Sequence, residues 1–306
     1  ILCGQSLCAY AVDLVCTTNT TISSDATYDN VTINENVKLT INSGATLTVK
    51  QNLTINGLLS NKGVLDVKKD VVVGSTGVVP KESIVSATGS VTTSWGRKSY
   101  SLSVSKEVNN GIFRLSGSGR QNITVNNNGS YSFYDSGWLN DIDPEIVNNL
   151  SQSEKNKLNI VSSFTFYDVE LNNTSAYTED HVNDGVHMFG NPLYVENVMT
   201  LNNGILYTEK FDDPTDRPVP SRLIFWKRSQ TNNLTMASNN VMSFIDGGLV
   251  LCIEGRQDGL AAVGSKGESA YCYFNNSGTG SGSSKKFQVS YQGGYASGAN
   301  SNNLSA

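Results

Sequence analysis

Both histidines of the chain lie in one short segment that is rich in acids. His181 and His187 fall within residues 179–187, together with three carboxylate side chains. Imidazole and carboxylate groups bind transition metals when a fold brings them together. The spacing matches no helical zinc motif, however, and Asp184-Gly185 is typical of a turn. We therefore interpret this segment as a solvated polar loop rather than a metal site.

A second acidic segment offers only oxygen ligands. Asp212, Asp213 and Asp216 lie in a proline-rich stretch. Their carboxylates would suit calcium, a hard cation that is common in the loops of secreted proteins. The segment lacks the glycine and the distal glutamate of an EF-hand loop, so a proline-rich surface turn is the preferred interpretation. We expect no cofactor, with calcium as the one alternative.

Aromatic side chains give the best indication of binding. Trp95, Tyr134, Trp138 and Trp226 could form a platform on which a sugar ring stacks, because aromatic rings combine apolar area with a polar handle. The competing interpretation places most aromatics in the core or in strand pairs, since they favour strands in any case. These four residues are our candidate ligand-binding set.

No set of residues indicates a catalytic centre. A Ser/His/Asp triad is not indicated with only two histidines, and the Gly/Ser run at 278–284 lacks the Lys-Ser/Thr of a phosphate-binding loop. Polysaccharide-active enzymes built on β-helices use carboxylates with Arg or Lys from several coils. Asp66 and Asp70 are the main outward acids of the regular repeats. Three or more such acids converging in a groove would exclude the structural interpretation, whereas a flat Thr/Asn/Lys face would exclude the enzyme.

Five cysteines are present, but Cys3 and Cys8 belong to the apolar N-terminal segment. Cys252 and Cys272 could form a disulfide between neighbouring strands in an oxidising compartment, which would leave Cys16 single. The alternative is that all three are small buried apolar residues. There is no Cys-x-x-Cys spacing, so a structural zinc site is not expected.

The elements that would carry these residues are short strands. One sequence motif occurs three times between residues 31 and 73. It consists of two apolar-x-apolar triplets that are separated by three mostly polar residues. Alternation with period two predicts strands with one buried face. Repetition at a short spacing predicts a solenoid whose turns stack on one another. The triplets of the three copies begin at Val31 and Val37, at Leu47 and Leu53, and at Leu65 and Val71.

The predicted fold class is all-β, with a right-handed parallel β-helix, or β-solenoid, in the N-terminal part. Asn-Gly and Ser-Gly turns between the strands favour this over leucine-rich or ankyrin repeats, which contain helices. Asp143-Pro144-Glu145 predicts one short capped helix. The expected division of the chain is a signal-peptide remnant at 1–11, a β-solenoid at 12–139, a helical insertion or boundary at 140–160, a second block of solenoid or β-sandwich-like strands at 161–277, and a Gly/Ser/Asn-rich linker or truncated repeat at 278–306.

The segment at 1–11 ends in Ala9-Tyr10-Ala11, the small-x-small pattern that precedes a signal-peptidase cut. A hydrophobic strand capping the solenoid is the alternative. The net charge of −5 argues against nucleic acid as a partner. No later stretch is long and apolar enough for a transmembrane helix, so no transmembrane segment is expected.

The second half resembles a known class of proteins. The runs FYDVELNN at 166–173, LYVENVMTLNNGIL at 193–206 and SFIDGGLV at 243–250 resemble the large, repetitive, adhesin-like surface proteins that Bacteroidota secrete. The resemblance covers about residues 160–265. Where those proteins often carry Phe-Pro-Val-Gly, this chain has Ala-Ala-Val-Gly at 261–264. The resemblance implies an extracellular β-rich protein, of a class often exported through a C-terminal sorting domain, and it supplies no catalytic residues.

We therefore expect a secreted or cell-surface protein on the extracellular side of the outer membrane, non-catalytic, structural or adhesive. Its expected partner is an extracellular glycan or envelope component. A β-helix polysaccharide lyase or glycoside hydrolase is the alternative. A subunit of an extracellular fibre, self-associating through the exposed strand edges of the solenoid ends, is a further alternative.

Overall fold

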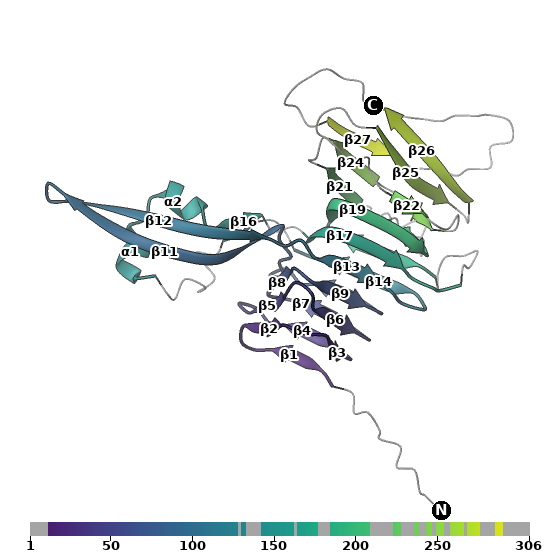
Figure 1. Cartoon of the computed structure of the whole chain (residues 1–306), viewed down its shortest axis with the longest axis horizontal. Coiled ribbons are helices and arrows are strands. Elements are labelled where there is room, and N and C mark those ends of the chain that lie inside the picture. Colours follow the sequence, from purple (N-terminus) through teal and green to yellow (C-terminus); the bar gives the residue numbers. More distant parts are fainter. Residues whose placement is uncertain are drawn as a thin grey trace, which may run out of the picture.

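The computed structural model describes residues 12–127, 130–132, 142–161, 164–176 and 184–208, and then the strands from β21 onward. Beyond Thr208 the side chains described are those of Ser243 and Ile245. The protein is all-β, with long parallel sheets and, in the described residues, two short helices. The strands stack from β1 and β3 at one end to β26 and β27 at the other (Figure 1).

The first sheet has ten strands, and its neighbours pair in parallel except for the last two, which are antiparallel. Its strands in spatial order are β1 (Leu14–Cys16), β4 (Val31–Ile33), β7 (Leu53–Ile55), β10 (Val71–Val73), β14 (Gln121–Val125), β18 (Val186–Gly190), β20 (Ile205–Tyr207), β23 (Phe244–Asp246), β25 (Asp258–Ser265) and β26 (Glu268–Asn275).

The second sheet is also parallel until its last pair. Its strands in spatial order are β3 (Ala26–Tyr28), β6 (Thr46–Val49), β9 (Val64–Val67), β13 (Ile112–Leu115), β17 (Phe164–Asn172), β19 (Leu193–Asn203), β21 (Leu223–Lys227), β24 (Leu249–Ile253) and β27 (Lys285–Val289), with β22 (Met236–Ser238) also beside β19. The third sheet holds β2 (Thr20–Ile22), β5 (Lys38–Ile41) and β8 (Leu58–Asn61).

The first nine strands visit the three sheets in turn, so each pass of the chain adds one strand to each sheet. The spacing of these passes differs from the spacing of the repeated motif. Val31 pairs with Leu53 in the next pass, whereas Leu47 pairs with Leu65. The repeated motif is therefore not the repeat of the structure, because a pass has three similar apolar-x-apolar strands and the motif spans only two of them.

Inward side chains form apolar columns that run along the stack and make up the main core. One column of the second sheet runs through Leu47, Leu65, Phe113, Val169 and Met199, each of which is fully buried. The Phe113 ring stacks on that of Phe166 with a centroid distance of 4.2 Å. Burial of such a side chain contributes about 1.5–3 kcal/mol, so stacking of passes supplies the stability that one pass lacks.

Asparagines form a ladder at the corner that precedes the first sheet. Asn30 donates to Asp13 and Asn52 donates to Asn30, and two passes further on Asn122 donates to Asp70. The backbone N–H of each donor, Asn30, Asn52 or Asn122, bonds to the same carboxylate or amide oxygen as its side chain. These side-chain bonds explain the recurring Asn-x-Thr sequence, in which an Asn corner leads into a strand whose middle Thr faces outward.

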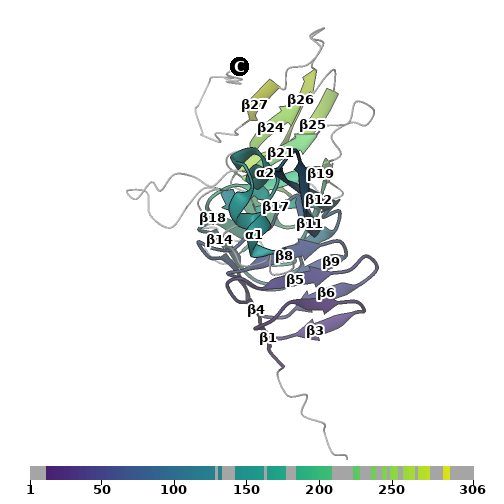
Figure 2. The same ribbon diagram turned by 90° about the vertical axis from the view of Figure 1, so that its left-hand side faces the viewer.

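The strands β11 (Glu82–Ser94) and β12 (Arg97–Val108) leave this stack as a long antiparallel hairpin, which we call the arm (Figure 1). The helices α1 (Pro144–Asn149) and α2 (Gln152–Asn156) lie against it (Figures 1 and 2). The helix α1 begins as the sequence predicts, with Asp143 as its N-cap and Pro144 in the first turn. A small antiparallel pair, β15 (Ser130–Ser132) with β16 (Asn159–Val161), flanks the helices.

The helices do not interrupt the sheets. The strand β13, which precedes them in the chain, pairs in parallel with β17, which follows them, and β14 pairs likewise with β18. Residues on both sides of the boundary suggested at 140–160 therefore belong to the same two sheets, and the arm and helices are insertions between successive strands.

Candidate functional site

The tip of the arm presents a fully exposed tryptophan. Trp95 has a relative exposure of 100% and lies in the two-residue turn between β11 and β12. Both turn residues have positive φ, 52° at Trp95 and 72° at Gly96, which is the type I′ geometry that matches strand twist. Glycine adopts such angles freely, but a bulky residue there is an outlier that costs free energy. The chain thus keeps an indole where neither packing nor backbone geometry favours one.

The surroundings of Trp95 are exposed and basic. All residues from 91 to 99 are exposed, and Arg97 and Lys98 follow the turn directly. An indole ring offers a flat apolar face and one N–H donor, which together suit stacking on a sugar ring. Arg97 adds attraction for an acidic group on the same ligand, whereas the Lys98 ammonium is paired with Glu145.

The arm has its own small core, which fixes it to the helices. Leu102 of β12 is buried with Ile142, Leu150 and Leu158 in a second apolar cluster, separate from the main core. A Cβ added at Gly89 would lie 2.6 Å from a methyl of Ile146, so the helices approach the arm closely. This packing holds one face of a hairpin that would otherwise be marginal on its own.

Two glutamates tie the helices to the arm. Glu145 of α1 accepts from the Lys98 ammonium at 2.6 Å and from the Tyr100 hydroxyl at 3.1 Å. Glu154 accepts from the Lys157 ammonium at 2.7 Å and from the backbone N–H of Leu102 at 2.9 Å. These donors stabilise the carboxylates and lower the pKa of both Glu145 and Glu154 below the ordinary value.

A buried amide network fixes the root of the arm to the stack. The Asn109 side chain donates to the Pro80 carbonyl at 2.7 Å and accepts from the Ser60 hydroxyl of β8 at 2.8 Å. The Ser83 hydroxyl at the start of β11 bonds to the same amide. Buried polar groups that are fully bonded specify one geometry, so the direction in which the arm leaves the stack is fixed.

The face of the arm that points away from the helices is made of hydroxyls. Successive cross-strand pairs put Ser or Thr opposite Ser, as in Ser90 and Ser101, whose oxygens are 2.7 Å apart. All members of this hydroxyl face are exposed: Ser86, Thr88, Ser90, Thr92, Ser94, Ser99, Ser101, Ser103 and Ser105.

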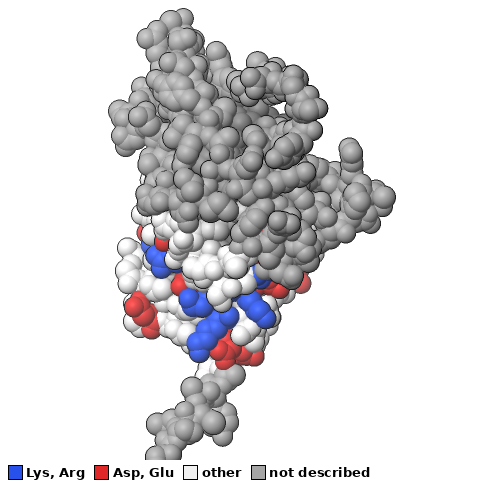
Figure 3. Space-filling model, turned by 90° about the vertical axis from the view of Figure 1, so that its right-hand side faces the viewer, with Lys and Arg blue, Asp and Glu red and all other residues white. Residues whose placement is uncertain are grey.

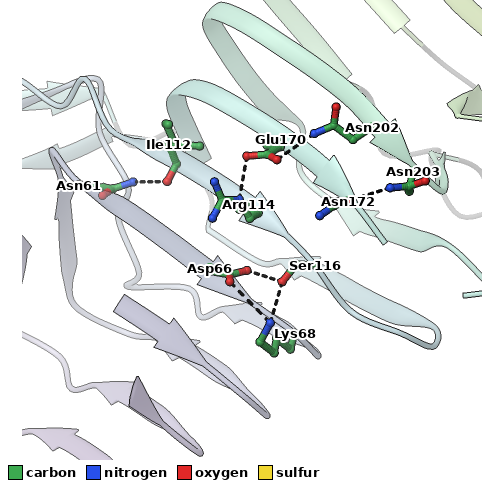
Figure 4. Close-up of polar contacts among 10 residues, drawn as sticks. All are labelled: Asn61, Asp66, Lys68, Ile112, Arg114, Ser116, Glu170, Asn172, Asn202 and Asn203. Atoms are coloured by element: carbon green, nitrogen blue, oxygen red, sulfur yellow. Dashed lines mark hydrogen bonds and ion pairs between the residues drawn. The ribbon is translucent and has the colours of Figure 1, made fainter. Parts of the chain in front are cut away.

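A second polar feature lies on the outer face of the second sheet (Figure 4). Asp66, Arg114 and Glu170 come from β9, β13 and β17 and are register neighbours, so they form a ladder across three passes. Arg114 donates to Glu170 at 2.7 Å, and Asn202 donates to the other oxygen of Glu170 at 2.9 Å. Asp66 bonds to the Ser116 hydroxyl and lies 3.7 Å from the Lys68 ammonium.

Asp168 lies on the same strand and outer face as Glu170, two residues away. Burial raises its pKa, while bonds from the Asn197 amide and the Val198 N–H oppose that shift. Three acids and one Arg from neighbouring passes therefore share this face, as a β-helix enzyme would require. Each already has a neutralising or donating partner, which is also what a structural ladder requires.

Charges are mixed on the side of the stack opposite the arm. Figure 3 shows acidic and basic side chains interspersed over the described lower passes, with no extended area of one sign on that face.

The structure separates the aromatic residues expected to bind ligand. Trp95 lies at the tip of the arm, and Trp226 lies on β21, where its backbone pairs with Cys252. Tyr134 and Trp138 lie outside the described residues. Among the four, the side chain of Trp95 is the one that the structure describes.

The metal-ligand candidates lie mainly in undescribed segments. Asp212, Asp213, Asp216 and His181 are outside the described residues. His187 is buried, bonds through Nε2 to the Asp184 carbonyl at 2.9 Å and lies 4.6 Å from the Tyr207 ring centroid. The part of the chain that the structure describes holds no group of three metal-ligating side chains, and calcium at the Asp212 segment stays a prediction.

Cys252 and Cys272 lie on β24 of the second sheet and β26 of the first sheet, so their strands do not pair with one another. Their side chains are not described, and the disulfide stays a prediction. Cys16 is a buried free thiol, and burial raises its pKa. In the described residues no helix has the length and apolarity needed to cross a bilayer.

Sequence reasoning missed the arm, its hydroxyl face and the two glutamates that support it. The alternating Ser/Thr on both sides of Trp95-Gly96 was the available signal, because it fits two strands of one hairpin. No family model, no curated protein and no solved structure matches this chain.

Proposed function

We propose that this chain is a secreted, non-catalytic surface protein in which a right-handed parallel β-helix carries a projecting arm that binds an extracellular glycan or envelope component. The observation that carries the proposal is the fully exposed Trp95 at the arm tip, held in a strained turn. Strain and apolar exposure cost free energy, and a ligand that stacks on the ring would offset that cost.

The scaffold supports this role. Parallel register between successive passes and the apolar columns inside them are what a β-helix needs. The bonded root at Asn109 and the core around Leu102 hold the arm in one direction. Placement of an adhesive group on such a support, far from the stack, would suit a Bacteroidota-type surface adhesin, the class that the second half of the chain resembles.

A glycan array tests the proposal. The chain should bind one or more glycans, and Trp95→Ala should abolish that binding while Trp95→Tyr retains part of it, because Tyr keeps an aromatic face. The matched control is Val85→Ala, which trims another exposed apolar side chain of β11. Binding that is unchanged in Trp95→Ala, or lost equally in Val85→Ala, would contradict a role for the tip.

The ladder on the second sheet supports a second candidate, a polysaccharide-active enzyme. Two same-face residues of a strand have Cα atoms about 6.6 Å apart. Asp168 and Glu170 have this relation, so two carboxyl groups lie on one face of the strand, and a pair of carboxyl groups is what glycosidases use. Release of reducing ends from a polysaccharide panel, lost in both Asp168→Asn and Glu170→Gln, would establish this candidate. Absence of release from acidic and neutral polysaccharides would favour the adhesin.

A further inference from the structure

We propose that the outer edge of β11 pairs antiparallel with the same edge of a second copy of this chain, which joins two arms into one four-stranded sheet. The inference is independent of what Trp95 binds. It rests on which backbone groups of the arm lack partners and on how differently its two edges are protected.

The side chains bound to Leu102 show which way the strand's backbone groups point. Its N–H donates to Glu154, and its C=O accepts from the Lys157 ammonium at 3.2 Å, so both groups point away from β11. Leu102 is the cross-strand partner of Gly89. In antiparallel pairing, two opposite residues either bond to each other through their backbone N–H and C=O groups or both point these groups away from one another. Gly89 therefore points its own N–H and C=O away from β12.

Alternate residues of β11 repeat this arrangement. Ala87, Val91 and Thr93 are two or four residues from Gly89 on a regular strand and expose their backbone groups on the same edge. Among the described residues, none supplies a hydrogen-bond partner to the backbone of these four positions. As far as the described residues go, the outer edge of β11 is thus a row of unpaired donors and acceptors that another strand could use.

The two edges of the arm differ in protection. Glu154 and Lys157 cover the edge of β12, and that strand also carries Arg97, Lys98 and Lys106. By contrast, β11 has no charged residue and no proline from Ser83 to Ser94. Charges, prolines and covering side chains are the means by which proteins prevent strand addition, and the described part of β11 shows none of them along this edge.

A second copy of the chain is the partner that these features fit. Two uncharged β11 edges can meet on a two-fold axis without opposing like charges, and an isologous contact of this kind is closed. The covered β12 edges then become the outer edges of the new sheet, so growth stops at two copies. The hydroxyl faces of both arms would form one surface, extended by cross-strand bonds like that between Ser90 and Ser101.

Sedimentation or light scattering of the full chain over a wide concentration range tests the proposal. The native chain should show twice the monomer mass, with a concentration-dependent return to monomer. The double variant Thr88→Lys/Thr92→Lys should weaken dimerisation about tenfold or more, because like charges then oppose one another across the axis. The matched control is Ser99→Lys/Ser103→Lys, which places the same charges on the cross-strand partners in β12.

Val91→Pro gives a second test that adds no charge. It removes one N–H that points away from β12 and leaves the pairing of β11 with β12 intact. Edge strands tolerate proline at positions whose N–H points away from the neighbouring strand. It should also weaken the dimer, and circular dichroism would verify folding of every variant. A native chain that stays monomeric at all concentrations, or lysines that act equally on both strands, would overturn the proposal.

Discussion

Glu154 accepts the backbone N–H of Leu102 at 2.9 Å, so a side chain from a helix occupies the hydrogen-bonding edge of β12. Lys157 completes the arrangement by donating to the Leu102 carbonyl at 3.2 Å and to Glu154 at 2.7 Å. Two side chains thereby satisfy the donor and the acceptor that a neighbouring strand would otherwise bind. The same contacts join the helices to the arm, so removal of Glu154 should affect both.

Glu154→Ala should lower the hydrogen-exchange protection of the Leu102 amide. The reason is that this amide then loses its acceptor and opens to water without any loss of pairing between β11 and β12. Amide exchange read by mass spectrometry or NMR measures the effect. Ser153→Ala, an exposed change on the same helix, should leave it unchanged. Equal protection of Leu102 in the native chain and in Glu154→Ala would show that the bond does not hold the arm.

The attachment of the arm should also weaken in acid. The pKa values of Glu145 and Glu154 are lowered in the folded state, mainly by bonds from Lys98 and Lys157. A carboxylate with a lowered folded pKa stabilises the fold fully above its ordinary pKa, and this stabilisation is lost as the pH falls through the folded value. The protection factor of Leu102 should therefore be constant near neutral pH and fall in acid.

Glu154→Gln provides the control for this pH dependence. Its amide cannot titrate, so the fall in Leu102 protection that is due to Glu154 should disappear, whereas any share due to Glu145 remains. A native chain and a Glu154→Gln variant with identical pH profiles would contradict the assignment.

The sequence predicts the strands of this fold well because alternation depends only on local burial. Val31, Leu47 and Leu65 are all inward, as their patterns indicate. Register depends on how many strands one pass contains, and that number is set by corner geometry far along the chain. Leu47 and Val31 have the same local pattern yet lie in different sheets, so local sequence alone could not match them.

The candidate site was harder to predict than the fold. Trp95 was identified as an exposed aromatic candidate, but its isolation at the tip of an arm follows from the pairing of Ser94 with Arg97. The support of that arm depends on Glu145 and Glu154, about 50 residues away along the chain. Their roles arise only from tertiary packing, and an acid in the first turn of a helix has a sufficient local explanation of its own.

Substitution of Gly63 tests how tightly successive passes stack. A Cβ at this position would lie 2.2 Å from the Ala45 carbonyl oxygen and 2.4 Å from that of Asn42, both backbone atoms of the pass below. Gly63→Ala should therefore lower the free energy of unfolding by about 1–3 kcal/mol, the usual cost of overpacking. Chemical denaturation measures it. Gly119→Ala is the control, since nothing lies within 4 Å of its Cβ position, and it should change stability by less than about 1 kcal/mol.

The last prediction concerns the coupling energy between Arg114 and Glu170 in the ladder on the second sheet. Their side chains are 31% and 20% exposed and their charged atoms are 2.7 Å apart, so solvent screens the pair only in part. A double-mutant cycle with Arg114→Ala and Glu170→Ala should give a coupling energy of about 1 kcal/mol, at the upper end for such pairs. The pair of Lys50 and Asp29, at 3.4 Å with the lysine 53% exposed, should give a coupling near zero in the same experiment. If the two cycles give equal energies, the ladder contributes no more than an ordinary surface pair, and a structural role for the aligned charges would be excluded.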